Sequence, residues 1–169
     1  NRGYFMETYS KADFAEIGLN YDFIQDNQSK SKKGVLRGLH FQKENSQAKL
    51  VRVVKGEVFD VAVDLRPGSK TYGKWEGVIL SEENKKMFMI PRGFAHGFLV
   101  LSDEAEFTYK CDDIYNHKAE GGLAWNDPEV AIEWPLENMK VDELLTSEKD
   151  AKWPSLKELK ETDLFQNLK

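Results

Sequence analysis

Short apolar runs separated by turn residues recur through the middle of the chain at spacings of about eight to twelve residues, which is typical of an all-β sandwich or barrel. The segment 58–65 shows this most clearly. Its apolar residues, from Phe59 to Leu65, fall at alternate positions, and Asp60 and Asp64 fall between them. Successive side chains of a strand point to opposite faces, so the alternation predicts a strand that is buried on one face only.

Further strands and a few short helices follow from the same pattern. We predict strands at six other places: 34–42, 49–54, 75–80, 87–90, 94–101 and 105–111. Helix signals are confined to the ends, where Ser10 can cap a short helix running to Ile17, and Ser147 and Ser155 can cap two short C-terminal helices. Seven or more strands in one small domain indicate a sandwich, a jelly roll or a closed barrel, whose inward-facing polar residues deserve most interest.

The size and charge of the chain narrow the range of partners. A length of 169 residues with 40% hydrophobic residues predicts one domain, spanning 1–169. The net charge of −5 argues against nucleic acid or an anionic membrane as the main partner, because phosphate binding normally requires a basic surplus. Any anionic ligand must therefore be bound by local cations.

Cysteine usage and hydropathy indicate a cytoplasmic protein. Cys111 is the only cysteine, which excludes an intrachain disulfide and a cysteine-based zinc site. There is no apolar run near the ~20 residues of a membrane span and no signal-peptide pattern. Because the chain begins at Asn1 rather than methionine, we expect that an N-terminal segment precedes it.

Several common kinds of chemistry lack their usual sequence markers. The three histidines, His40, His96 and His117, show no ligand spacing, so a metal site is not predicted. The chain also has no nucleophile elbow, no Walker loop and no dinucleotide-binding glycine motif. Nucleophilic acyl transfer, nucleotide hydrolysis and hydride transfer are therefore disfavoured.

A polar cluster on two predicted strands is the best candidate site. In the first strand, Leu36, Gly38, His40 and Gln42 are expected to share a face, and Gly38 is expected to leave open space beside the imidazole. His40 could serve a ligand, or it could be a structural histidine bonded to the backbone.

Three cations lie in the same two strands of this acidic protein. Arg37, Lys49 and Arg52 could form a basic pocket for a diphosphate or for the oxygen of an enolate. The alternative is that they are solvated cations that protect strand edges.

Tyr109 is the candidate proton donor. It shares its strand parity with Phe107 and is therefore predicted to point into the interior. It is either a core tyrosine with a bonded hydroxyl or a general acid opposite a histidine base.

Long contiguous strings of the chain closely resemble the dTDP-4-dehydrorhamnose 3,5-epimerase family. The resemblance covers nearly the whole chain in order. It is strongest in Gln25-Asp26-Asn27, Gly34 to Gln42, Lys49-Leu50-Val51-Arg52, Gly56 to Asp64, Ile90 to Phe98, Tyr109-Lys110, Trp125 to Pro128, and Ser147-Glu148-Lys149-Asp150.

The resemblance implies a fold, an activity and catalytic roles. It implies a cupin-type jelly roll that forms a homodimer, uses no metal or other cofactor, and binds a dTDP-linked 4-keto-6-deoxyhexose. His40 would be the base, Asp150 would orient and charge its imidazole, Lys49 would stabilise the enolate oxygen, and Tyr109 would return a proton from the opposite face. The expected reaction is epimerisation at C3 and C5, in the supply of dTDP-L-rhamnose.

The resemblance also implies the remaining binding residues. For the nucleotide it indicates Arg2, Glu7, Gln25, Asn27 and Arg37, and for the remainder of the site His96, Tyr115, Glu120 and Lys149. In the family a strand precedes the segment of Arg2 and Glu7, and the first strands commonly cross to the partner subunit. His117 matches no such position and is expected at the surface.

Two alternatives stay open at this point. Related enzymes invert only one centre while they keep the base, so a 3-epimerase or 5-epimerase of a similar nucleotide sugar is the nearest alternative. A cupin that binds a nucleotide sugar without catalysis is the second, although it predicts a lost base or acid, and His40, Lys49, Tyr109 and Asp150 are all present.

Overall fold

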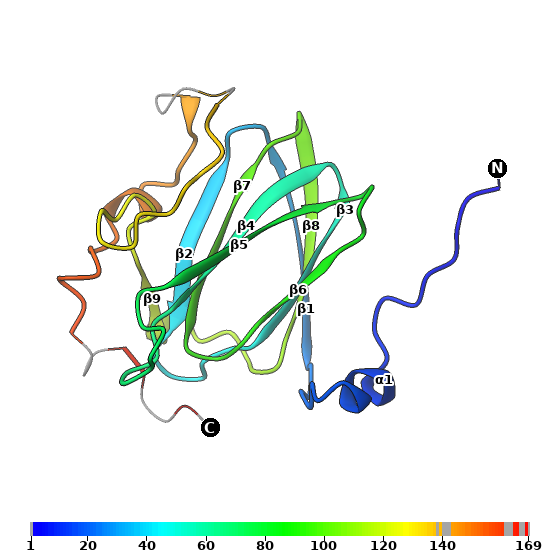
Figure 1. The fold of residues 1–169 in the computed structure, drawn as a ribbon, viewed down its shortest axis with the longest axis horizontal. Helices are drawn as coiled ribbons and strands as arrows, with labels where there is room; N and C mark the ends of the chain where they lie inside the picture. Colours follow the sequence, from blue (N-terminus) through cyan, green and yellow to red (C-terminus); the bar gives the residue numbers. More distant parts are fainter. Residues whose placement is uncertain (1, 138, 140–142, 161–163, 166–167, 169) are drawn as a thin grey trace.

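Two antiparallel β-sheets make up most of the molecule (Figure 1). The computed structural model describes residues 2–137, 139, 143–160, 164, 165 and 168. The four-stranded sheet contains, in spatial order, β1 (Gln25–Lys32), β8 (Glu104–Cys111), β3 (Lys49–Lys55) and β6 (Met87–Ile90). The five-stranded sheet contains β5 (Trp75–Ser81), β4 (Glu57–Asp64), β7 (Phe94–Val100), β2 (Leu36–Gln42) and β9 (Glu120–Gly122). Because the chain passes repeatedly between the two sheets, the fold is the predicted all-β jelly roll.

Short helices lie toward the two ends of the chain, as predicted, but one also lies between β8 and β9, where none was predicted. Helix α1 (Lys11–Glu16) begins after Ser10, whose hydroxyl accepts a hydrogen bond from the backbone N–H of Asp13 at 3.4 Å. In the described part of the chain, the other helices are two short 3-10 helices, η1 (His117–Ala119) and η3 (Asp150–Lys152). Ser147 lies before η3 as expected, whereas Ser155 begins a turn that is closed by Glu158.

Two strands of the fold were absent from the prediction. Strand β1 pairs with β8 along its whole length, from Gln25 opposite Cys111 to Lys32 opposite Glu104. It contains no apolar residue, so a search for apolar alternation could not find it. Strand β9 is only three residues long and contains two glycines.

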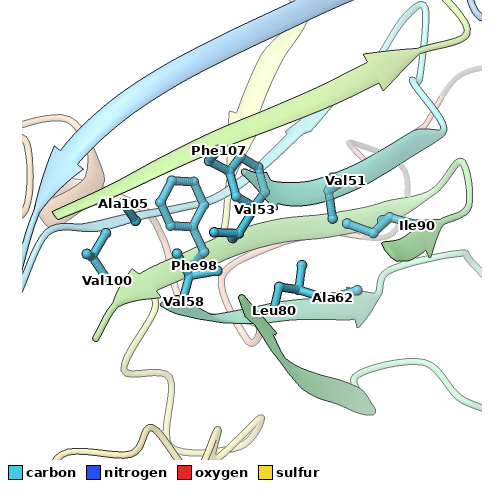
Figure 2. Close-up of a cluster of buried hydrophobic side chains, with 10 residues drawn as sticks. All are labelled: Val51, Val53, Val58, Ala62, Leu80, Ile90, Phe98, Val100, Ala105 and Phe107. Carbon is cyan, nitrogen blue, oxygen red and sulfur yellow. The ribbon is translucent and has the colours of Figure 1, made fainter. Parts of the chain in front are cut away.

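The space between the sheets is filled by apolar side chains. They come from six strands, and Figure 2 shows them meeting between the two layers: Val51, Val53, Val58, Ala62, Leu80, Ile90, Phe98, Val100, Ala105 and Phe107. Each exposes 5% or less of its surface, so this cluster is a close-packed apolar core beneath any site in the interior of the barrel.

The prediction that the strand at 58–65 is buried on one face only was wrong. Val58 and Ala62 face the interior cluster, while Val61 and Val63 lie in a second apolar cluster on the outer face of the five-stranded sheet. The chain beyond β9 covers that outer face (Figure 1), where Leu123 and other residues of the C-terminal third join the cluster. This packing fixes the C-terminal segment beside β2 and β9.

The two aspartates of that strand are also buried rather than exposed. Asp64 closes the following turn, where its carboxylate accepts hydrogen bonds from Arg66, Ser69 and Thr71. Burial raises the pKa of Asp64, but these donors outweigh that effect and hold the pKa well below its usual range. Asp60 points into the barrel and belongs to the site described below.

The N-terminal segment projects away from the two sheets (Figure 1). Its rings are exposed, Tyr4 by 71% and Phe5 by 98%, although Tyr4 contacts the ammonium of Lys85 at 4.8 Å. Within the described residues, no helix has the length and apolarity required to cross a membrane.

Candidate active site

His40 and Asp150 form a close pair at one end of the barrel. Nε2 of His40, on β2, lies 2.6 Å from Oδ1 of Asp150, the first residue of η3. Asp150 is 4% exposed, and its carboxylate also accepts hydrogen bonds from the backbone N–H of Gly38 and from the indole of Trp153, each at 3.2 Å. Burial raises the pKa of Asp150, but the bonds from His40, Gly38 and Trp153 outweigh it, so the pKa falls below its usual value.

A local irregularity of β2 decides which side chains face the interior. The register between β2 and β7 shifts between Arg37, opposite Phe98, and His40, opposite His96. Phe98 and His96 share the inner face of β7, so Arg37 and His40 lie on the same side although they are three residues apart. The expectation that Leu36 shares the face of His40 was therefore wrong.

The role predicted for Gly38 was also wrong. The residue leaves no open space beside His40, because a Cβ atom there would lie 2.7 Å from Gly97 Cα and from the carbonyl oxygen of His96. With φ at +119°, Gly38 allows β2 and β7 to approach closely and directs its N–H at Asp150. Its contribution is to the backbone that holds the pair.

A second histidine–aspartate pair lies deeper in the barrel. Nε2 of His96 is 3.0 Å from both carboxylate oxygens of Asp60, and the His96 ring stacks on Phe107 with centroids 6.1 Å apart. Burial lowers the pKa of His96 despite the attraction of Asp60, and the neighbouring Lys49 and His40 lower it further. Sequence reasoning missed the role of Asp60 because alternation placed it on the solvent face.

Lys49 and Tyr109 face this pair from the opposite sheet. The Lys49 ammonium lies 5.9 Å from the centroid of the Tyr109 ring, which packs on Phe107 at 5.9 Å. The inward direction predicted for Tyr109 is therefore confirmed. Burial lowers the pKa of Lys49 and raises the pKa of Tyr109, so the phenol remains a proton donor at neutral pH.

Polar residues of β1 line the same interior. Gln25 donates to Asn27, and Asn27 donates to the sulfur of Cys111 at 3.7 Å. Toward the other end of β1, the Arg37 guanidinium donates two hydrogen bonds to the hydroxyl of Ser31. The polar composition that hid β1 from sequence analysis therefore supplies a polar wall of the barrel.

The rim near His40 contains three further candidate residues. Glu120 Oε1 lies 2.6 Å from the Lys149 ammonium, and its Oε2 accepts a hydrogen bond from the Tyr115 hydroxyl at 3.4 Å. Burial raises the pKa of Glu120, but Lys149 and then His40 outweigh it and lower the pKa. His117 is at the surface as expected, with its side chain 83% exposed.

Three predicted residues do not join this group within the chain. Arg2 and Glu7 are exposed on the projecting N-terminal segment. Arg52 lies opposite Thr108 while Lys49 lies opposite Cys111, so in this regular strand Arg52 faces away from Lys49 and outside the barrel. Of the three cations that were candidates for a basic pocket, Lys49 and Arg37 therefore lie on inner strand faces and Arg52 does not.

The described residues contain no group of three or more histidine, cysteine, aspartate or glutamate side chains arranged to bind a metal ion. What the barrel brings together is a histidine–carboxylate pair, a half-buried lysine and an inward phenol. These are groups that accept, donate and stabilise charge around a proton transfer.

Comparison with known proteins gives the family. A family model described as dTDP-4-dehydrorhamnose 3,5-epimerase matches residues 1–158. A relative of that name from Methanothermobacter thermautotrophicus is 59% identical over 157 residues, which cover 93% of this chain and 84% of the relative. The chain belongs to the dTDP-4-dehydrorhamnose 3,5-epimerase family. It is therefore an isomerase, because an epimerase interconverts stereoisomers.

Solved structures share its fold. A dTDP-6-deoxy-D-glucose-3,5-epimerase from Legionella pneumophila, solved in complex with dTDP-4-keto-L-rhamnose, superposes with a TM-score of 0.92 at 49% identity, over 98% of this chain and 87% of that one. A 3′-monoepimerase from Streptomyces bikiniensis in complex with dTDP-quinovose gives a TM-score of 0.81 at 32% identity, over 89% of this chain and 75% of that one. The jelly roll is thus of the cupin type expected from the resemblance.

Proposed function

We propose that the chain converts dTDP-4-dehydro-6-deoxy-D-glucose to dTDP-4-dehydro-L-rhamnose by inverting C3 and C5, in the biosynthesis of dTDP-L-rhamnose. The observation that supports this best is the His40–Asp150 pair, which lies at the mouth of a barrel lined by Lys49 and Tyr109. The relatives named above act on, or bind, dTDP-linked sugars of this kind.

The base of the reaction is His40. Protons on C3 and C5 flank the C4 ketone and become removable when the resulting enolate is stabilised. With Nε2–H of His40 directed at Asp150, the lone pair of Nδ1 is the one available for a substrate proton. Asp150 fixes that tautomer and stabilises the imidazolium that forms.

The enolate and the second proton transfer are assigned to the opposite sheet. The half-buried Lys49 ammonium stabilises the C4 oxygen as negative charge develops on it. Tyr109 then donates its phenolic proton to the face of the carbon opposite His40, which inverts the centre. Each inversion moves one proton to His40 and one from Tyr109. Proton exchange with solvent water then restores both groups before the next inversion, so no cofactor is required.

The nucleotide and the rest of the sugar are assigned to the polar groups around this centre. Gln25, Asn27 and Arg37 line the interior from β1 and β2 and are proposed to bind the nucleotide portion. His96, Tyr115, Glu120 and Lys149 are proposed to surround the sugar and the diphosphate. Because the protein has a net negative charge, an anionic diphosphate must be bound by local cations, and Arg37 and Lys149 are the two cations of this group.

The chain is further proposed to act as a cytoplasmic homodimer in which each N-terminal segment completes the site of its partner. Arg2 and Glu7 are exposed outside their own barrel, and the neighbouring Tyr4 and Phe5 are exposed apolar rings without a covering layer within the described chain. Crossing to a second copy would bury these rings and bring Arg2 to a nucleotide.

The reaction is tested by incubating the protein with dTDP-4-keto-6-deoxyglucose in deuterated water. NMR should show deuterium at both C3 and C5, and reduction of the product by a coupled reductase should give the L-rhamno sugar. Exchange at one carbon only would mean a single-centre epimerase like the Streptomyces relative. Binding without any exchange would contradict catalysis and support a binding protein.

The crossing of the N-terminal segments is tested by complementation between two inactive variants. Arg2→Ala and His40→Ala chains are refolded together in equal amounts. If the segments cross, each mixed dimer has one intact site, so activity should return to about a quarter of wild type in a random mixture. If each segment serves its own barrel, no mixed dimer has an intact site and activity stays at background.

A further inference from the structure

Trp153 contacts both members of the His40–Asp150 pair and, on the rim beside them, Lys149. Its indole Nε1 donates to Oδ1 of Asp150 at 3.2 Å, the same oxygen that lies 2.6 Å from Nε2 of His40. Its ring meets the His40 ring edge to face with centroids 6.1 Å apart, and the Lys149 ammonium lies 5.7 Å from its centre. Trp153 has no part in the proton transfers or in the binding contacts proposed above.

The Trp153 indole packs directly against the backbone of Gly122 on β9. A Cβ atom at Gly122 would lie 2.2 Å from Cδ2 of Trp153, so only glycine lets the ring rest on β9 at this point. Gly122 is also the residue of β9 that lies opposite His40 in the register. The sheet therefore sets the distance between the indole and the catalytic pair.

We propose that Trp153 is a positioning residue for the His40–Asp150 pair, whose indole N–H fixes the orientation of the carboxylate and takes up part of its negative charge. This inference rests on the proposed function for its catalytic meaning, whereas the geometry of the pair is independent of the substrate.

The hydrogen bonds that Asp150 accepts explain why the indole N–H of Trp153 matters. Oδ2 accepts from the backbone N–H of Gly38, and Oδ1 accepts from His40 and from Trp153. Without the indole, Oδ1 faces His40 alone and the carboxylate becomes a stronger base. The pair then keeps its proton to a higher pH, and the carboxylate has more freedom to rotate away from Nε2.

Other charged groups also act on His40, and the test must leave them in place. Two groups interact with His40 directly: Glu120 on β9, and His96 on β7, which is paired with Asp60 on β4. The ammonium groups of Lys49 and Lys149 act indirectly, because Lys49 interacts with Glu120, and Lys149 with both Glu120 and Asp150. Trp153→Phe retains an aromatic ring at this position and removes the N–H donor together with part of the ring system, a loss of volume that the control variant below shares.

In the active enzyme, Trp153→Phe is expected to lower kcat about tenfold with KM nearly unchanged, as for the loss of a residue that orients a catalytic group. The acid limb of the kcat profile should move upward by about half a pH unit, because the pair must lose its proton before His40 can act as a base. The matched control is Trp134→Phe, which removes an indole donor to the carbonyl of Trp125 in the C-terminal layer. It should move neither quantity.

A second readout needs no substrate. The imidazole signals of His40 are followed by NMR against pH in both variants, and only Trp153→Phe should raise the midpoint of the coupled pair. A raised midpoint in a protein that does not act on the dTDP sugar would support the positioning role and refute the proposed function. An unchanged midpoint and an unchanged pH profile would overturn the positioning role.

Gly122→Ala provides an independent variant in case Trp153→Phe does not fold. Its Cβ must displace the indole while leaving the residue present. The same upward shift of the midpoint is expected, and a midpoint equal to that of wild type, with the indole displaced, would contradict the inference.

Discussion

Replacing His40 with asparagine is expected to lower turnover by about a thousandfold or more, which is the upper range for the loss of a general base. Asparagine can still bond to Asp150, but it cannot accept a proton from C3 or C5. Both carbons should lose deuterium exchange together, because a single base on one face serves both. The measurement is deuterium incorporation at each carbon by NMR, with binding of dTDP followed by calorimetry.

Binding separates a catalytic effect from a structural one. Since the nucleotide is assigned to Gln25, Asn27 and Arg37, dTDP affinity should remain within about threefold of wild type. His117→Asn is the matched control, because that imidazole is 83% exposed and should leave turnover within about twofold. Retained turnover in His40→Asn would remove His40 from the role of base, and lost dTDP binding would indicate a structural defect instead.

The strands that can be read from the sequence are those with an apolar side. Seven were predicted by alternating or continuous apolar residues, and the structure contains all of them. Strand β1 was missed because its inner face is polar and lines a site, and β4 was assigned a solvent face because the inward direction of Asp60 cannot be distinguished from exposure. A polar residue on a strand has two explanations, and only the packing of the second sheet decides between them.

The positions of the candidate site residues could likewise be predicted from the sequence only in part. The inward direction of Tyr109 follows from regular alternation in β8, whereas the register shift in β2 moves Arg37 to the face of His40 against simple parity. Asp150 could not be chosen over Asp60 by pattern, because it reaches His40 on a C-terminal segment whose path is fixed by the outer apolar cluster. Its assignment depended on the family resemblance.

Trp153 shows what neither pattern nor resemblance supplied. An indole three residues after Asp150 looks like an ordinary aromatic residue of a C-terminal turn in the sequence. Its significance appears only when Gly122, far away in the chain, leaves room for the ring beside the catalytic pair. Local sequence rules do not describe contacts of this kind, since they depend on the tertiary approach of β9 and η3.

Tyr109→Phe is expected to separate proton exchange from inversion. The variant keeps the ring that packs on Phe107 and lies near the Lys49 ammonium, so the barrel wall is preserved. His40 can still remove a proton and return one to the same face, and exchange at C3 or C5 should therefore fall by less than tenfold. Inversion needs a donor on the opposite face and should fall by about a hundredfold or more.

The two rates are measured on one sample, with deuterium incorporation read by NMR and the inverted product captured by the coupled reductase. Tyr21→Phe removes a phenol outside the barrel, where its ring stacks on Phe23, and should change neither rate. Burial raises the pKa of Tyr109, so the wild-type enzyme keeps its phenolic proton between about pH 7 and pH 9. The ratio of the inversion rates of wild type and Tyr109→Phe should therefore stay constant over this range. Equal losses of exchange and inversion would show that Tyr109 supports the first proton abstraction as well, and the assignment of the two faces would then be wrong.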